Sequence, residues 1–185
     1  MASESELIAA LSAVFKLSDA NVRENVLIGI GDDGAVIAPS SRKSVLAADM
    51  AIEGVHFNRK WSTLREIGAK ITAANLADIY AMGGDPKYLL VSAGLTADFG
   101  IAEITELAQG IAEEAALVGA SVVGGDISRA EQLVISISVF GEVEKPITRS
   151  AAKVGDSVVI SGLPGKSAAG LIQLHSGQLQ SDNIT

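Results

Sequence analysis

The chain has 185 residues, of which 48% are hydrophobic and 19% are charged, a composition that supports an ordinary hydrophobic core and excludes disordered and fibrous proteins. Its formal net charge of -8 has the wrong sign for a surface that follows a nucleic-acid backbone, so we expect no nucleic-acid partner. The sequence contains no cysteine, which excludes disulfide scaffolds, thiolate metal sites and cysteine nucleophiles.

The first 50 residues predict one helix and three strands. Residues 5–15 carry apolar side chains at helical spacing, after serines that can cap a helix. Strands are expected at residues 26–30, 35–38 and 44–50, with a Gly-Asp-Asp-Gly sequence at 31–34.

The central part of the chain alternates between helices and strands. The apolar pattern over residues 63–82 predicts the longest helix, which glycines end at 83 and 84. A buried strand at 87–95, a helix at 101–118 and strands at 121–123 and 133–143 follow. This order predicts an α+β fold in which helices cover one face of a mixed, mainly antiparallel sheet.

The last part of the chain predicts a strand at 157–161 and a helix at about 167–174. One strand and one helix cannot close a core of their own. We therefore expect residues 1–148 to form an N-terminal domain and residues 149–185 to begin an incomplete second domain. The alternative is that this segment docks on the first domain.

The sequence also predicts where the protein works. Its longest apolar stretches fall far short of the roughly 18 residues that a membrane span requires. Its first six residues carry acidic side chains, whereas a signal peptide begins with basic ones. We therefore expect a cytoplasmic protein with no membrane partner.

Four groups of aspartates are the candidates for chemistry: Asp32-Asp33, Asp49, Asp78 and Asp126. Asp78 follows Ile71 by seven residues, about 20° around an ideal helix, so the pattern places it in the core-facing stripe. A buried carboxylate must be protonated, paired with a cation or bound to a metal. Because carboxylate oxygens are the ligands that Mg²⁺ prefers, and Mg²⁺ keeps places for phosphate oxygens, these residues predict a Mg²⁺-phosphate site.

Each candidate also has a structural interpretation. Asp33 and Asp126 stand beside glycines and can be turn residues. His56 can contact a ligand or cap a loop, and Arg149 can clamp a phosphate or pair with a surface acid. The Gly-Leu-Pro-Gly-Lys-Ser sequence at 162–167 is not a P-loop, because two residues instead of four separate its glycines.

Five motifs occur in order along the chain. They are Gly-Ile-Gly-Asp-Asp-Gly-Ala-Val at 29–36, Asp49 with Glu-Gly-Val-His-Phe at 53–57, Asn-Leu-Ala-Asp-Ile-Tyr-Ala-Met-Gly-Gly-Asp-Pro at 75–86, Gly-Gly-Asp at 124–126, and Thr-Arg-Ser at 148–150. Together they resemble the thiamine-monophosphate kinase family, whose superfamily also holds aminoimidazole ribonucleotide synthetase and selenophosphate synthetase. The second and third motifs favour the thiamine branch.

The resemblance implies an enzyme that transfers the γ-phosphoryl group of ATP directly to thiamine monophosphate, giving thiamine diphosphate. It implies several Mg²⁺ ions as cofactors, no covalent nucleophile among the catalytic groups, and a homodimer through the N-terminal domain. By motif position, the implied metal ligands are Asp33, Asp49, Asp78 and Asp126, the nucleotide contacts are Gly125, Asp126 and Arg149, and the contact to the substrate phosphate is His56.

The chain departs from the family pattern in two places. Ala47 and Ala48 precede Asp49 where the family usually has hydroxyl side chains, so two oxygen ligands are lost. The family also continues through a complete C-terminal domain, so we expect low or no activity from the 185-residue chain alone. Two alternatives remain: a related synthetase with another acceptor, and a non-catalytic module that binds nucleotide or dimerises.

Overall fold

The computed structural model describes residues 3–16, 24–162 and 164–177. In chain order its elements are α1 (Glu4–Val14), β1 (Val26–Ile28), β2 (Val36–Ile37), β3 (Lys43–Ile52), α3 (Leu64–Ala81), β4 (Asp85–Leu95), α4 (Ile101–Ala116), β5 (Ser121–Arg129), β6 (Val134–Val143), the short 3-10 helix η1 (Arg149–Ala151) and α5 (Lys166–His175).

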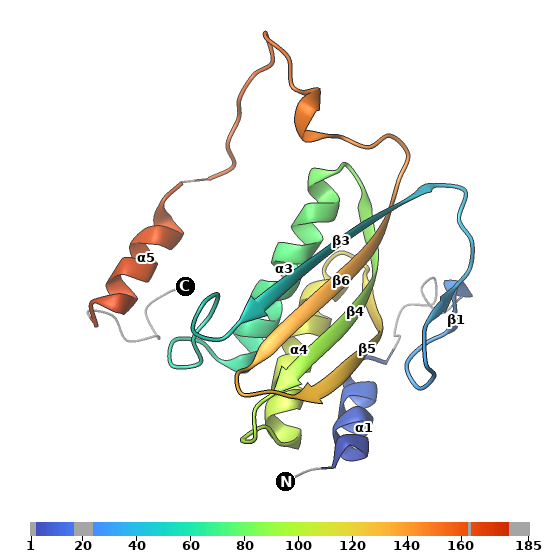
Figure 1. The fold of residues 1–185 in the computed structure, drawn as a ribbon. Coiled ribbons are helices and arrows are strands. Elements are labelled where there is room, and N and C mark those ends of the chain that lie inside the picture. The colour runs from blue at the N-terminus through green and yellow to red at the C-terminus, as the bar shows by residue number, and fades with distance from the viewer. Residues whose placement is uncertain (1–2, 17–23, 163, 178–185) are drawn as a thin grey trace.

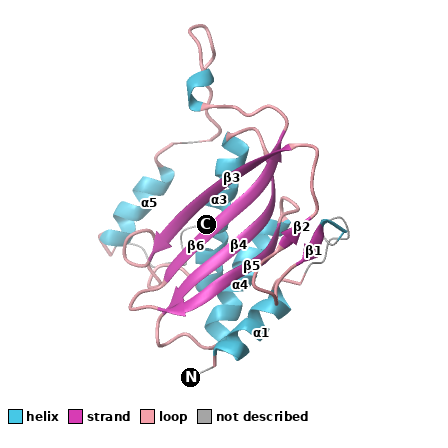
Figure 2. Ribbon diagram, turned by 45° about the vertical axis from the view of Figure 1, so that its right-hand side comes forward, coloured by secondary structure: helices cyan, strands magenta, loops and turns pink. Residues whose placement is uncertain are grey.

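A four-stranded sheet with the order β3-β6-β4-β5 forms the centre of the fold, and α3 and α4 cover one of its faces (Figures 1 and 2). β6 is antiparallel to both β3 and β4, whereas β4 and β5 are parallel. β1 and β2 form a separate antiparallel pair, and α1 packs against α4. The predicted α+β fold with a mixed, mainly antiparallel sheet is confirmed.

The burial pattern of β6 shows which face of the sheet meets the helices. Buried and partly exposed residues alternate along its whole length, as expected for a strand with one covered face. Ile135, Ile137 and Val139 are fully buried under the helices. The opposite, open face carries Leu46 and Met50 of β3, whose side chains are 60% and 55% exposed.

Capping boxes fix the N-terminal ends of α1 and α3. Thr63 accepts a hydrogen bond from the Glu66 backbone N–H, and the Glu66 side chain accepts one from the Thr63 backbone. Ser3 and Glu6 make the same reciprocal pair at α1. Since a capping box satisfies two backbone donors that the helix leaves open, it makes these helix starts predictable from sequence.

The helices α3 and α4 approach each other through glycines. A Cβ added to Gly68 would collide with the Leu107 carbonyl oxygen, and one added to Gly110 would collide with the Arg65 carbonyl oxygen. The two helix backbones therefore lie closer together than any side chain at these positions would allow.

After β6 the chain leaves the sheet (Figure 1). The expected strand over residues 157–161 is not formed, and Val158, Val159 and Ile160 are 100%, 87% and 71% exposed. A strand needs a partner for its backbone groups, and none of the described strands pairs with this segment. The expected helix is present as α5, where the His175 ring lies edge-on to Trp61 with centroids 4.8 Å apart.

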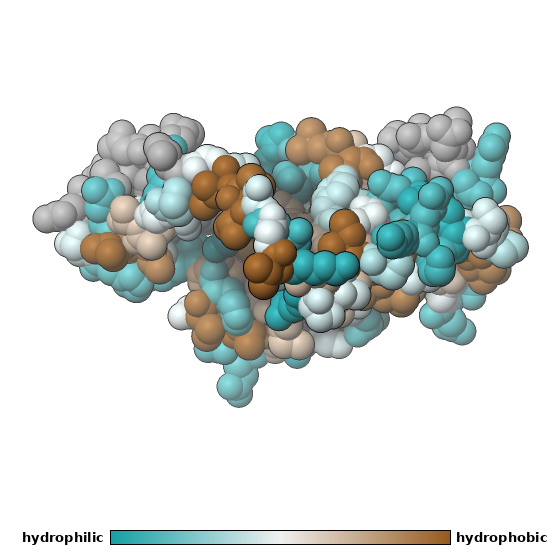
Figure 3. All heavy atoms as spheres, turned by 90° about the horizontal axis from the view of Figure 1, so that it is seen from above, coloured by the Kyte–Doolittle hydropathy of each residue, from teal (hydrophilic) through white to brown (hydrophobic). Residues whose placement is uncertain are grey.

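The surface seen from above carries several separate hydrophobic patches among hydrophilic side chains (Figure 3). In the described part of the chain, no helix has the length and apolar character needed to span a membrane.

Candidate functional site

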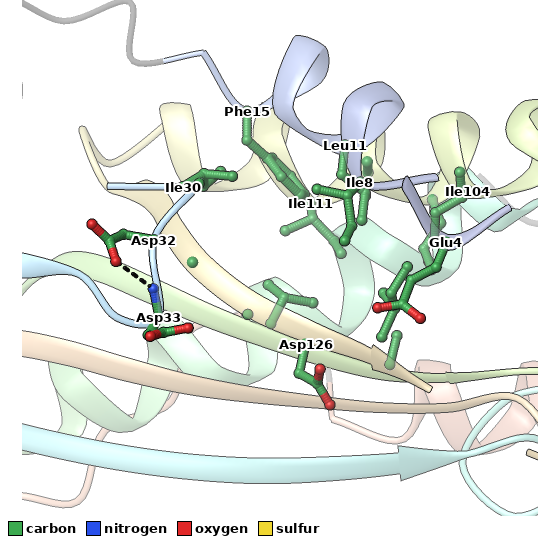
Figure 4. A pocket seen from close by; sticks show the side chains of 18 residues that line it. Glu4, Ile8, Leu11, Phe15, Ile30, Asp32, Asp33, Ile104, Ile111 and Asp126 are labelled. Atoms are coloured by element: carbon green, nitrogen blue, oxygen red, sulfur yellow. Dashed lines mark hydrogen bonds between the residues drawn. The ribbon is translucent and has the colours of Figure 1, made fainter. Parts of the chain in front are cut away.

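A pocket with a volume of about 410 Å³ opens between α1, α4 and the β4–β5 side of the sheet (Figure 4). Apolar side chains of the two helices form one wall, among them Ile8, Leu11, Phe15, Ile104 and Ile111. The carboxylates at the pocket are those of Glu4, Asp32, Asp33 and Asp126. An apolar wall beside acidic groups suits an organic ligand whose anionic part is held through cations.

Asp32 and Asp33 reach the pocket from the loop between β1 and β2. This loop turns at Gly31, whose φ of 119° favours glycine. The Asp33 backbone N–H donates a hydrogen bond of 2.9 Å to Oδ1 of Asp32 (dashed line in Figure 4). The Asp32 carboxylate therefore supports the loop, which makes Asp33 the better candidate for binding a ligand.

Asp126 owes its position to a β-bulge. The pairing of β5 with β4 shifts by one residue after Leu89, so Val123 has no partner. Accordingly Val122 and Val123 are both buried although they are neighbours in a strand. Because a shift of one residue exchanges the two faces of a strand, the bulge places Asp126 opposite Ser92, on the open face of the sheet. β5 is an edge strand, so Asp126 lines the pocket from the sheet edge, whereas the apolar wall of the pocket lies on the helix-covered face.

Gly125 lines the same pocket as Asp126, its neighbour. A Cβ at this position would collide with the Val91 carbonyl oxygen of β4. The close approach of the β4 and β5 backbones is thus sufficient to explain why residue 125 is a glycine. Its place in the pocket also leaves bare backbone where a ligand can approach.

Asp49 is exposed and lies in β3, one edge strand of the sheet. It stands opposite the buried Ile137, so it belongs to the helix-covered face. Its backbone N–H donates a hydrogen bond of 3.1 Å to Oδ1 of Asn75 in α3. This bond ties the β3 edge to the helix that carries Asp78.

Asp78 is exposed, so the prediction that it lies in the core-facing stripe of its helix is wrong. Asn75 and Ile79 occupy the centre of that stripe and are fully buried. The side of α3 that carries Asp78 is buried at Ile71. Further along the helix the same side is exposed, as it also is at Ala74. The Asp78 carboxylate is therefore in contact with solvent and needs no partner for the fold to be stable.

The structure divides the four predicted metal ligands into two groups. Asp33 and Asp126 line the pocket, whereas Asp49 and Asp78 are associated with the β3 edge and α3. β3 and β5 are the two edges of the sheet, three strand spacings or about 14 Å apart. Consistent with this, the described residues contain no group of three or more His, Asp or Glu side chains that could hold one metal ion.

His56 lies in the loop after β3, and three hydrogen bonds hold it, one of them from its own backbone N–H to the Ile52 carbonyl at 2.9 Å. The Ile52 backbone N–H donates to Nδ1 of His56 at 3.1 Å, and Nζ of Lys70 donates to the His56 carbonyl at 3.0 Å. With Nδ1 as an acceptor, the neutral ring carries its proton on Nε2. Because His56 is exposed, Nε2 can donate a hydrogen bond to a ligand oxygen.

The contacts of Arg59 with Glu53, Asp98 and Phe99, called here the arginine clasp, support the loop after β3. Nε of Arg59 donates to Glu53 at 2.8 Å, Nη1 donates to Asp98 at 2.8 Å, and the guanidinium lies 5.5 Å from the centre of the Phe99 ring. A hydrogen bond of 2.5 Å from Thr96, followed by the one from Arg59, lowers the pKa of Asp98 below its usual value. The clasp fixes the loop after β3 against the loop between β4 and α4. No local sequence pattern indicates these contacts, because the two acids are 6 and 39 residues from Arg59.

Arg149 is in η1, beyond the end of β6 and at the opposite end of the sheet from α1 (Figures 1 and 2). It is exposed and is not one of the residues that line the pocket. The structure therefore does not bring it together with Gly125 and Asp126.

The chemistry of the carboxylates fits divalent cations. Within the described residues, no lysine or arginine forms an ion pair with Asp33, Asp49, Asp78 or Asp126. Mg²⁺ is usually bound through only one or two carboxylates together with water and phosphate oxygens. Two separate pairs of uncompensated aspartates therefore suit Mg²⁺ that arrives with a phosphate ligand better than a cage formed by protein alone.

Comparison with known proteins gives consistent results. A family model described as "AIR synthase related protein, N-terminal domain" matches residues 31–143. The thiamine-monophosphate kinase of Mycobacterium tuberculosis is 38% identical over 147 residues, which are 78% of this chain and 44% of the relative. The chain thus spans about half the length of the curated relatives that it matches.

Solved structures also resemble the chain. A crystal structure of thiamine-monophosphate kinase from Stenotrophomonas maltophilia superimposes with a TM-score of 0.81 at 30% identity, covering 96% of this chain and 55% of that one. A structure of AaThiL complexed with AMPPCP and TMP gives a TM-score of 0.71 at 33% identity, covering 94% and 53%.

Proposed function

The chain belongs to the AIR synthase related protein, N-terminal domain family, and from this we propose that it is the metal- and nucleotide-binding part of a kinase. The proposed reaction transfers the γ-phosphoryl group of ATP to thiamine monophosphate and gives thiamine diphosphate. The names of the relatives support this choice, as does the neighbour that binds AMPPCP, a non-hydrolysable ATP analogue.

The observation that carries the proposal is the pocket between α1, α4 and the sheet. It places the predicted ligands Asp33 and Asp126 at one cavity, beside an apolar wall and the bare backbone of Gly124 and Gly125. An apolar wall suits a planar base, and uncompensated carboxylates suit the metal ions that accompany a polyphosphate.

The described side chains support direct phosphoryl transfer. Such a transfer requires positioning and neutralisation of charge more than a covalent nucleophile. Mg²⁺ held by Asp33 and Asp126 would neutralise the negative charges of the phosphates and carboxylates, which would otherwise repel one another. We assign to His56 a hydrogen bond from Nε2 to an oxygen of the acceptor phosphate, with the ring held by Ile52.

Asp49 and Asp78 are proposed to hold further Mg²⁺ at the β3 edge. Ala47 and Ala48 supply no side-chain oxygen there, so the protein ligands would be these two carboxylates and backbone carbonyls. For Arg149, which lies in η1 after β6, we propose a contact to the nucleotide. We also propose that a second domain begins at residue 149.

We propose a homodimer through the open face of the sheet, because Leu46 and Met50 expose apolar surface there. Sedimentation equilibrium should give twice the chain mass of 18.9 kDa, and Met50→Glu should shift the chain to the monomer. Leu117→Glu, which changes an exposed residue in the helix layer, is the matched control and should leave the dimer intact. A dimer that resists Met50→Glu would contradict this interface.

The proposed function is tested by calorimetric titration of AMPPCP into the chain with and without Mg²⁺. Binding does not require turnover, so the titration tests the site even if this chain alone is inactive. We expect binding that requires Mg²⁺. Equal affinity in the presence of Mg²⁺ and of a chelator would contradict a site held through metal, and no binding in either case would contradict the nucleotide site.

A further inference from the structure

Two polar side chains of the described part of the chain are buried in the core of the protein. Among the described residues, Thr72 and Asn75 are the buried polar side chains, and both are completely inaccessible to solvent. They lie three residues apart in α3, so they share one side of the helix. Burial of a polar side chain is unfavourable unless its hydrogen bonds are made, so a residue of this kind needs an explanation.

The two residues differ in their contacts. Thr72 Oγ1 makes no hydrogen bond within the described structure. Asn75 uses both ends of its amide: Nδ2 donates to the Ile71 carbonyl at 2.9 Å, and Oδ1 accepts from the Asp49 N–H at 3.1 Å. Because one end must donate and the other must accept, the orientation of the amide is determined.

Asp49 is held from two sides by side chains. Its N–H donates to Asn75, and its carbonyl accepts a hydrogen bond of 3.2 Å from Oγ of Ser136 in β6. An edge strand normally leaves such groups to water or to another strand. At Asp49, in contrast, the backbone is fastened to the helix below it and to the neighbouring strand.

We infer that Asn75 is a positioning residue that fixes Asp49, and with it the direction of the Asp49 carboxylate, relative to Asp78. Asp78 is less than one helical turn from Asn75, so the same turn of α3 sets the backbone positions of both aspartates. This inference rests on the proposed function, because it concerns the affinity of these aspartates for a divalent cation. Groups that orient metal ligands in this way typically change metal affinity by about 10- to 100-fold when they are mutated.

Asn75→Leu tests the inference, with Thr72→Val as the matched control. Asn75→Leu keeps a side chain of similar size and removes both hydrogen bonds. Thr72→Val changes an equally buried polar residue of the same helix that contacts neither aspartate through a hydrogen bond. If Asn75→Leu does not fold, Asn75→Ala removes the same bonds without added bulk.

Two measurements are made on each variant. Amide hydrogen exchange at Asp49, followed by NMR, reports whether its backbone is held. Titration with Mn²⁺ in the presence of AMPPCP, followed by the paramagnetic signal of free Mn²⁺, reports cation affinity. We expect Asn75→Leu to abolish the protection of the Asp49 amide and to weaken Mn²⁺ binding about tenfold. Thr72→Val should change neither quantity.

The possible failures are distinguishable. If Asn75→Leu leaves the Asp49 amide protected, or leaves Mn²⁺ affinity unchanged while the original chain binds normally, the inference is overturned and the proposed function stands. An equal loss of affinity in Thr72→Val would indicate a general disturbance of the core, which also overturns the inference. If the original chain binds no Mn²⁺ with AMPPCP, the proposed function fails, and the inference fails with it.

Discussion

Replacement of Asp126 by asparagine is expected to weaken Mg²⁺-dependent binding of AMPPCP by about a hundredfold, equivalent to about 2.8 kcal/mol. The substitution keeps the size of the side chain and removes the charge that would hold the cation at the pocket. Loss of one partner from a close charge pair typically costs this much binding energy. Calorimetric titration at fixed Mg²⁺ concentration measures the change.

The matched control is Glu131→Gln, which removes the same charge from an exposed position between β5 and β6 that does not line the pocket. It should leave the affinity within about twofold, because exposed charges at a distance are screened by salt. The melting temperature of Asp126→Asn without Mg²⁺ should not fall, since the carboxylates around the pocket repel one another. Unchanged affinity in Asp126→Asn would remove Asp126 from the site.

Gly110→Ala is expected to lower the free energy of unfolding by about 3 kcal/mol, although alanine is the better helix former. The new Cβ would overlap the Arg65 carbonyl oxygen and lie 2.9 Å from the Arg65 Cα, and all of these atoms belong to the backbone of α3. No change of side-chain conformation can relieve this contact, so the two helices must move apart. Urea unfolding, followed by circular dichroism, measures the loss.

Gly170→Ala in α5 is the matched control for this effect. Gly170 is also a helical glycine, but a Cβ there would meet no atom within 4 Å. It should therefore leave stability unchanged or raise it by at most about 1 kcal/mol, the difference in helix propensity between the two residues. If Gly110→Ala behaved in the same way, the close approach of α3 and α4 would be contradicted.

Much of the fold was predictable because its causes are local. Residues 63–82 are predicted as a helix, and α3 begins one residue after the Thr63 cap and ends at Ala81. The alternation in residues 133–143 predicts β6, whose covered face carries Ile135 and Ile137. Caps and periodicity act within a few residues, so the sequence contains the information directly.

The arrangement of the candidate site was predictable only in part. The motif pattern singles out Asp33 and Asp126, which the structure places at one pocket although they are 93 positions apart in the numbering. Periodicity alone predicted the wrong environment for Asp78. The angle around an ideal helix gives the side on which a residue lies, but it does not show how far along α3 the packed elements cover that side. Their roles in binding metal remain predictions, to be tested by the titrations above.

The amino-acid sequence by itself determined the helices, most of the strands, the class of fold and the acidic residues suited to Mg²⁺. Only the tertiary structure decided that β5 pairs with β4 in parallel around a bulge at Val123, which sets the face on which Asp126 lies. It also decided that Asp49 and Asp126 stand at opposite edges of one sheet, and that Asn75 holds the first of them. The reason is that pairing, register and helix contacts depend on packing between segments far apart in the chain, and no local pattern encodes that packing.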